Sequence, residues 1–388
     1  METNNGTITY QYDALNQLTK ETLADGTTIT YEYDAVGNRT KKIVNNGTTT
    51  TTTYTYDAAD QLTAVNGQAY TYDANGNLTN NGNKTFVYDD DNRLIEVKNV
   101  SGTTIASFTY DQLGRRISKT TSNGTIYYHY DGDSNQVLYE TDANNNIVAE
   151  YTWDAYDHPI TMTKGGVTYY YHVNGHGDVT ALTDASGNVV AEYQYDAWGN
   201  ILSKTGAMAS ANPYRYAGYY YDEETGLYYL MARYYDANIG RFITRDTFHG
   251  FEDDPQSLNQ YAYGKNNPVT YIDPSGHISI NKRVQYALKY AIKFWLANYI
   301  GWDNASWIFT SIWAGIAKGR EAYKISYSKS AQEAVKHLGR SRTMLQNARK
   351  IALKVAIRAG LKAAIPISAV GDGYLLIRGF IKGWNKYK

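Results

Sequence analysis

Few residues in this chain have the types and spacing that acid–base chemistry requires. Glu333 and His337 are four residues apart, so on a helix they would lie one turn apart and could act as an acid/base pair. Such pairs more often belong to a solvated helix face. The chain has no Cys, which excludes disulfides and Cys-based metal sites. The C-terminal region shows no phosphate-binding loop and no zinc-ligand spacing, so we expect no metal and no cofactor.

Two aspartates are further candidates, but their local sequence is equally compatible with structural roles. Asp273 begins the segment Asp-Pro-Ser-Gly, which is a favourable β-turn. Asp246 could pair with Arg241 or Arg245 in an ordinary ion pair. The residues alone favour structural roles, so the elements that surround them must be considered.

Those elements begin with Tyr-Asp repeats. The chain has 40 tyrosines, and 33 of them precede residue 278. The tyrosine of each pair ends a segment with alternating residue types, such as 30–33, which predicts a strand. The aspartate begins a turn, such as 34–39. One such unit cannot bury its own apolar face, so the units must stack side by side. The pairs are Tyr12-Asp13, Tyr33-Asp34, Tyr56-Asp57, Tyr72-Asp73, Tyr88-Asp89, Tyr110-Asp111, Tyr130-Asp131 and Tyr195-Asp196, with Trp153-Asp154 as a variant.

These units resemble the YD repeats of the Rhs family of bacterial proteins, which are similar to those of teneurins and of insecticidal toxin-complex subunits. In that family the repeats form a long spiralling β-sheet that closes into a hollow shell. Residues 213–277 resemble the core element of the family, with matching stretches at 214–218, 222–229, 232–236, 240–243, 259–263 and 273–276.

The resemblance implies a multi-domain fold. We expect a β-rich YD-repeat sheet over residues 1–212, forming part of an Rhs shell. A core or plug element with an autoproteolytic motif is expected over 213–277. An all-α, cationic effector domain is expected over 278–388.

The resemblance also implies an intramolecular aspartyl peptidase that releases the variable C-terminal region. It assigns Asp246 and Asp273 as the carboxylate pair and Arg233 as the charge that orients and tunes them. Two confined carboxylates share a proton, so one can activate water while the other protonates the leaving group. The family cuts after the residue that follows Asp-Pro-x-Gly, usually Leu. Here that residue is His277, which predicts cleavage between His277 and Ile278. The remaining motif residues are expected to be structural: Pro268, Pro274, Gly276, Gly240 and Arg241.

The net charge and the spacing of apolar residues both change after residue 277. Residues 1–277 carry 17 Lys and Arg against 34 Asp and Glu, whereas residues 278–388 carry 20 against 4. Such asymmetry within one chain is a functional clue. Apolar residues from Val284 to Tyr299 recur on one helical face, which predicts an all-α region.

Three functions are compatible with the cationic region. Its apolar segment 294–317 contains one charge, and the four tryptophans in this segment together with the 20 cations of the region favour a membrane-active, pore-forming effector. The positive charge also suits a nuclease, with Glu333 and His337 as its acid/base pair. The third alternative is a non-toxic cell-surface adhesin or scaffold. The tryptophans are Trp295, Trp302, Trp307 and Trp313.

The expected partners follow from these functions. A toxin used in interbacterial competition implies a cognate immunity protein, and a pore-former also implies a target-cell membrane. Nucleic acid is a partner only of the nuclease. We expect a secreted or cell-surface bacterial protein, although no signal peptide is visible at the N-terminus and the sequence does not specify the delivery machinery.

Overall fold

The computed structural model describes residues 2–3, 6–132, 134–154, 157–250, 254–277 and 279–281. The chain divides into two compact units, residues 1–129 with 137–279 and residues 130–136 with 280–388. The predicted carboxylate pair falls in the first unit. The all-α domain expected over 278–388 lies outside the described residues, apart from 279–281.

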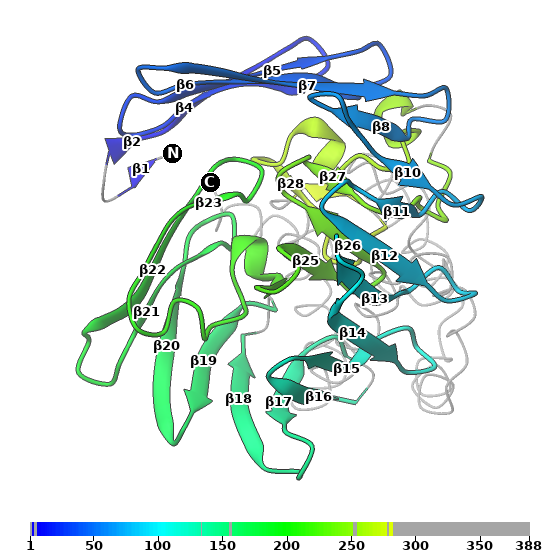
Figure 1. The fold of residues 1–388 in the computed structure, drawn as a ribbon. Helices are drawn as coiled ribbons and strands as arrows, with labels where there is room; N and C mark the ends of the chain where they lie inside the picture. Colours follow the sequence, from blue (N-terminus) through cyan, green and yellow to red (C-terminus); the bar gives the residue numbers. More distant parts are fainter. Residues whose placement is uncertain are drawn as a thin grey trace, which may run out of the picture. The chain divides into compact units, whose positions relative to one another are not determined.

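The repeats form two antiparallel meanders in which each strand pairs with the next one along the chain (Figure 1). One sheet has seven strands and the other has 14, which confirms the β-rich repeat architecture. The seven-stranded sheet contains β3 (Thr9–Tyr12), β4 (Leu18–Thr22), β5 (Thr28–Tyr33), β6 (Arg39–Asn45), β7 (Thr49–Tyr56), β8 (Leu62–Val65) and β9 (Gln68–Ala69). A separate hairpin pairs β1 (Glu2–Thr3) with β2 (Gly6–Thr7).

The second sheet continues directly from the first. Its strands are β10 (Thr71–Tyr72), β11 (Leu78–Asn80), β12 (Lys84–Tyr88), β13 (Leu94–Asn99), β14 (Thr104–Tyr110), β15 (Arg116–Thr121), β16 (Gly124–Tyr130), β17 (Val137–Thr141), β18 (Ile147–Trp153), β19 (Pro159–Lys164), β20 (Val167–Val173), β21 (Val179–Thr183), β22 (Val189–Tyr195) and β23 (Ile201–Thr205). Buried and exposed positions alternate along strands such as β14 and β22, as expected for sheets with one packed face.

In most repeats the aspartate builds the turn that follows it. In the turn at Asp34, the carboxylate Oδ1 accepts the backbone N–H groups of Val36 and Asn38 at 3.1 and 2.8 Å. The Asp34 N–H donates to the Asn38 carbonyl at 2.9 Å, and Gly37 supplies a φ of 84°. This is an Asx-type turn. The same two bonds to Oδ1 recur at Asp13, Asp57, Asp73, Asp89, Asp111, Asp142, Asp184 and Asp196.

In most repeats the tyrosine ties its hairpin to the preceding one. The Tyr33 hydroxyl donates to the carbonyl of Leu18, 15 residues earlier, at 2.7 Å. Trp153 replaces Tyr once, and its indole N–H makes the equivalent bond to Val137 at 2.8 Å. Both residue types therefore supply a ring for packing and one donor at its tip. Equivalent hydroxyl bonds link Tyr56 to Arg39, Tyr88 to Leu78, Tyr110 to Leu94 and Tyr195 to Val179.

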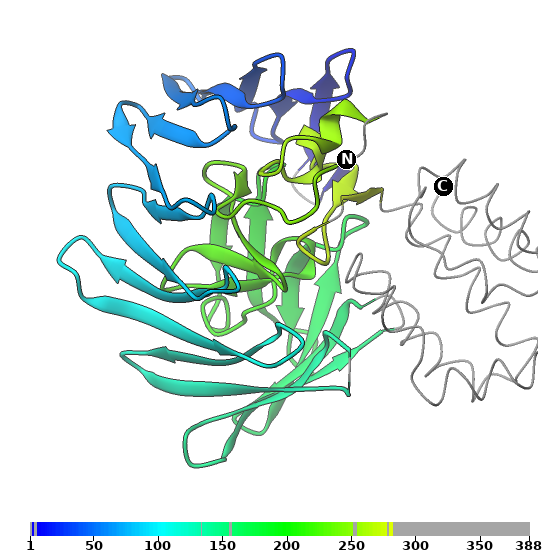
Figure 2. The same cartoon turned by 90° about the vertical axis from the view of Figure 1, so that its right-hand side faces the viewer.

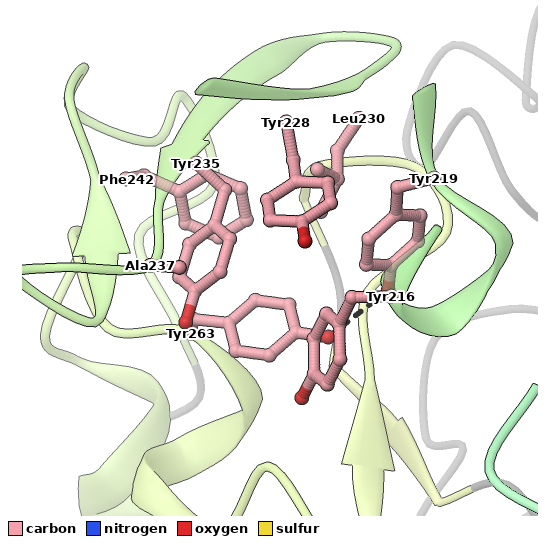
Figure 3. Packing of buried hydrophobic residues seen from close by; sticks show 8 residues of the cluster. All are labelled: Tyr216, Tyr219, Tyr228, Leu230, Tyr235, Ala237, Phe242 and Tyr263. Carbon is pink, nitrogen blue, oxygen red and sulfur yellow. Dashed lines mark hydrogen bonds between the residues drawn. The ribbon is translucent and has the colours of Figure 1, made fainter. Parts of the chain in front are cut away.

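Residues 213–277 leave the repeat pattern and form an element that packs against both sheets (Figures 1 and 2). Its four-stranded sheet consists of β24 (Tyr220–Asp222), β25 (Leu227–Leu230), β26 (Arg233–Asp236) and β27 (Arg241–Phe242). Short segments complete it: η1 (Tyr216–Gly218), η2 (Pro255–Ser257), η3 (Gly264–Asn266) and β28 (Tyr271–Ile272), and β29 (Ile280–Asn281) follows in the second unit. Its core is largely a cluster of tyrosine rings (Figure 3).

Buried ion pairs anchor this element to the second sheet. Arg116 on β15 and Asp222 on β24 form a fully buried pair at 2.6 Å, and Lys119 contacts the other oxygen of Asp222 at 3.1 Å. Removing one partner of such a pair costs about 3–5 kcal/mol, because the other charge stays buried without compensation. These contacts hold the core element in a fixed position against the repeats.

The first sheet contacts the last repeat turn. Glu21 on β4 is buried and accepts the N–H of Ala197 at 2.9 Å and the Tyr31 hydroxyl at 2.5 Å. Lys42 on β6 pairs with Asp196 at 3.1 Å. Burial and the charge of Asp196 raise the pKa of Glu21 to about 8.

Candidate active site

Arg233 is the first residue of β26, and its side chain is buried beneath the core sheet. Its guanidinium carbon lies 3.5 Å from the centre of the Phe242 ring on β27, and Nη1 donates to the Gln260 carbonyl at 2.8 Å. Ring stacking and a backbone acceptor therefore fix the plane of the guanidinium.

The two predicted aspartates meet at this guanidinium. Arg233 Nη2 lies 2.8 Å from Asp246 Oδ2 and 3.6 Å from Asp273 Oδ2. All three residues are buried, with exposed fractions of 5% for Arg233, 7% for Asp246 and 1% for Asp273. Burial lowers the pKa of Arg233, and the charges of the two carboxylates oppose that change. One cation thus serves two carboxylates in a site nearly closed to solvent.

Asp246 is held by several contacts. Its Oδ1 accepts the Phe248 N–H at 2.8 Å and lies 2.8 Å from Nδ1 of His277. Its main chain is fixed by Gln260, since the Asp246 N–H donates to the Gln260 carbonyl and the Gln260 side-chain amide donates to the Asp246 carbonyl. The ion partner of Asp246 is therefore Arg233 rather than the Arg241 or Arg245 considered from the sequence.

Asp273 builds a turn like those of the repeats. Its Oδ1 accepts the N–H of His277 at 3.0 Å and the Ser275 hydroxyl at 3.3 Å, and Gly276 has a φ of 74°. The Asp273 N–H, however, donates to the hydroxyl of Tyr219 at 2.9 Å. The corresponding N–H in a repeat turn donates to the carbonyl four residues ahead, which here would be the carbonyl of His277.

The peptide that precedes His277 is bound on both sides. The Gly276 carbonyl accepts a bond from Arg233 Nε, while the His277 N–H donates to Asp273. A Cβ on Gly276 would lie 2.5 Å from the Leu230 carbonyl oxygen, so the turn packs directly on the end of β25. The backbone approaching the predicted cleavage point is therefore fixed against both the cation and a carboxylate.

The other predicted motif residues have structural contacts. Arg241 Nη2 donates to the Asp60 carbonyl at 2.7 Å, which links β27 to the first sheet. Gly240 has a φ of 67°, and a Cβ there would meet Arg39 and Trp198. The Pro268 carbonyl accepts the Tyr216 hydroxyl at 3.4 Å, and Pro274 is half-buried within the Asp273 turn.

The remaining predicted residues lie outside the described part of the chain. These are Ile278, Glu333, His337, Trp295, Trp302, Trp307 and Trp313. Within the described ranges, no helix has the length and hydropathy needed to cross a bilayer. The same ranges contain no cluster of three or more His, Asp or Glu side chains suited to a metal ion.

Sequence reasoning missed three residues of this site: Tyr219, Gln260 and Ser275. Tyr219 is one of many tyrosines in the core segment, so nothing in its local sequence distinguishes it. Gln260 lies within a recognised motif stretch, but its contacts with Asp246 and Arg233 depend on the tertiary fold. Ser275 was visible only as part of the Asp273 turn.

This chain is similar to a known family and to larger bacterial proteins. Residues 1–269 match the family described as Teneurin YD-shell. The tRNA nuclease WapA of Bacillus subtilis strain 168 is 42% identical over 339 residues, covering 85% of this chain and 14% of WapA. The tRNA(Glu)-specific nuclease WapA of Bacillus subtilis subsp. natto strain BEST195 is 47% identical over 270 residues, covering 69% of this chain and 12% of that protein. This chain therefore spans a small part of each relative.

A solved structure supports the fold. The crystal structure of TcdB2-TccC3-Cdc42 aligns with 70% of this chain and 15% of its own, with a TM-score of 0.56 and 23% identity. At that identity the likeness shows the fold alone. The family match over most of the chain, together with the observed repeat turns, shows that the chain belongs to the YD-repeat (Rhs) shell family.

Proposed function

We propose that this chain is part of an Rhs-type polymorphic toxin, in which a YD-repeat carrier cuts itself between His277 and Ile278 and releases residues 278–388. One observation carries this proposal: a single buried guanidinium nitrogen contacts both Asp246 and Asp273, and Asp273 forms the turn that leads to the bond.

The proposal gives the two carboxylates different roles. Asp246 is the proposed base that activates water, because its contact with Arg233 is the shorter of the two. Asp273 is the proposed acid, because its turn leads directly to the bond and its Oδ2 lies farther from the cation.

The reaction is then a peptide hydrolysis. Asp246 takes a proton from water as the water oxygen bonds to the carbonyl carbon of His277. Asp273 gives its proton to the nitrogen of Ile278, and the C–N bond breaks. The first products are a carboxylic acid at His277 and an amine at Ile278, which become a carboxylate and an ammonium group by proton transfer. Asp246 then holds a proton and Asp273 has lost one, so a proton returning from Asp246 to Asp273 restores the pair. Arg233 stabilises the negative charge of the pair throughout.

The test is the fate of the purified full chain. We expect a fragment of residues 278–388 whose N-terminal residue is Ile278, identified by intact-mass analysis and N-terminal sequencing. Asp246→Asn and Asp273→Asn should both abolish it, since each removes one member of the pair. Asp184→Asn is the matched control, because Asp184 makes equivalent turn bonds in a repeat. An uncut wild-type chain, or cutting that persists in both variants, would refute the proposal.

A specific observation favours a nuclease as the released effector. Residues 1–277 make up about 71% of the chain, whereas the match to the tRNA nuclease of strain 168 covers 85% of it. That match therefore extends into residues 278–388. This favours the nuclease alternative over the membrane-active effector that the apolar, Trp-containing segment suggests.

Induction of the full chain in bacteria distinguishes these effectors. A nuclease predicts degraded tRNA while the membrane potential is still normal, and Glu333→Gln with His337→Ala should prevent degradation. Early depolarisation with intact tRNA would instead support the membrane-active effector. Normal growth with both intact would favour the surface scaffold. For a toxic effector we also propose export from the producing cell and a cognate immunity protein.

A further inference from the structure

The side chain of His277 contacts the site that would cut its own peptide bond. His277 Nδ1 lies 2.8 Å from Asp246 Oδ1, and the side chain is 23% exposed. Asp246 Oδ2 is already engaged by Arg233 at 2.8 Å. The imidazole and the Phe248 N–H therefore share the carboxylate oxygen that the cation does not contact.

A second histidine in the same turn position shows that this contact is not a property of the turn. His158 follows Asp154 by four residues, as His277 follows Asp273, and its Nδ1 lies 3.2 Å from Oδ2 of that same turn aspartate. His277 instead reaches across to Asp246, 31 residues away in sequence. The position of His277 is therefore set by the site around Arg233.

We propose that the His277 imidazole restrains self-cleavage by occupying Asp246 Oδ1, and that the restraint weakens as the imidazole loses its proton. This inference rests on the proposed cleavage function. A base can activate water only where an oxygen can accept the water proton. A charged imidazole binds that oxygen more strongly than a neutral one, because the hydrogen bond is then assisted by charge. His277 thus acts as a positioning residue that opposes the reaction.

Several ionisable groups surround His277. Asp246 faces the ring, Asp273 binds its backbone N–H, and Arg233 binds the preceding carbonyl. Two further groups, Arg245 and His249, contact the side chain of Gln260. Imidazoles are the groups that ordinarily titrate between pH 5 and 8, whereas carboxylates and guanidinium groups titrate outside that range.

The experiment follows cleavage of the full chain after refolding from denaturant at pH values from 5.5 to 8. We compare the wild type with His277→Leu, which is apolar, and His277→Phe, which retains a ring without nitrogen. Both variants should cut about tenfold faster than the wild type at pH 5.5, the difference expected when one charge-assisted hydrogen bond is removed. This advantage should shrink steadily towards pH 8. His158→Leu is the matched control and should follow the wild-type profile.

The outcomes separate this inference from the proposed function. Cleavage in all proteins with the same pH profile would overturn the restraint while leaving the cleavage function intact. Slower cleavage in both His277 variants at every pH would also overturn it, because the imidazole would then assist the reaction. Fast cleavage in the variants with a nearly inert wild type would support a strong restraint. If no protein is cut at any pH, both the cleavage function and this inference fail.

Discussion

The repeat turns and the Asp273 turn are built on one plan, but the backbone N–H of the aspartate has a different acceptor in each. Both place a carboxylate oxygen on the backbone N–H four residues ahead, and both use a positive φ at the position before it. In the Asp34 turn the aspartate N–H also closes the loop onto the carbonyl of Asn38. At Asp273 the same N–H donates to Tyr219.

This difference suggests how a structural motif can become a reactive one. A closed repeat turn engages the carbonyl at its end, and such a carbonyl is a poor target for water. At Asp273 the backbone N–H donates to Tyr219 instead, and Arg233 lies beside the carboxylate. Asp273 is therefore a candidate catalytic residue, although it caps its turn as the repeat aspartates do. No new backbone conformation is needed.

The turn at Asp196 provides a second comparison. It also receives a buried carboxylate from elsewhere in the chain, because Glu21 accepts the Ala197 N–H. The Asp196 N–H nevertheless donates to the Asn200 carbonyl at 3.0 Å, as in the other repeats. We therefore expect the Asp196 turn to contribute to stability and not to be cut.

Apart from the two aspartate variants, the largest expected effect on cleavage comes from Gly276→Ala. The new Cβ would lie 2.5 Å from the Leu230 carbonyl oxygen and would displace the turn from Arg233. A shift of about 1 Å at a reacting group lowers rates by roughly a hundredfold, which can be measured as the rate of fragment appearance after refolding. Gly114→Ala is the control, because Gly114 has nearly the same φ, 76°, with no atom within 4 Å. Equal cleavage rates in the two variants would contradict the importance of this contact.

Tyr219→Phe tests the redirected hydrogen bond directly. Without the hydroxyl, the Asp273 N–H can return to the carbonyl of His277 and close the turn as in a repeat. We expect cleavage to slow about fivefold to tenfold, because one neutral hydrogen bond contributes about 1 kcal/mol. Tyr195→Phe is the control: it removes a hydroxyl that binds the Val179 carbonyl in a repeat, and it should leave the cleavage rate unchanged. An unaltered rate in Tyr219→Phe would show that the hydroxyl does not matter.

Glu21→Gln should have the smallest effect on cleavage and should instead change stability. The pKa of Glu21 is raised from 4.5 to about 8, so the native state holds this proton more tightly than the unfolded chain does. The contribution of Glu21 to the free energy of unfolding therefore falls as pH rises from about 4.5 to about 8. Urea unfolding between pH 5 and 8 should show a flatter pH dependence in the variant. If the free energy of unfolding depends on pH equally in the variant and the wild type, Glu21 is not the cause of that dependence.

The sequence predicted the repeats well because their signals are local. Alternating strands, turn aspartates and Gly or Asn at positive φ act within a few residues of one another, and the structure retains each of them. The meeting of Arg233, Asp246 and Asp273 was expected only from family resemblance, since the three lie as far as 40 residues apart. The contacts of Tyr219 and His277 could not be predicted, because they depend on how the core element packs.

The ladder of tyrosine hydroxyls has a mechanical consequence. Hydroxyls such as those of Tyr33 and Tyr56 fasten one hairpin to a carbonyl of the hairpin before it, so these neighbouring hairpins share bonds beyond those of the strand ladder. Pulling one end of the chain must therefore break contacts in two hairpins together. Under force, we expect this protein to yield in blocks of several hairpins, with fewer and larger extension steps than its number of strands would suggest.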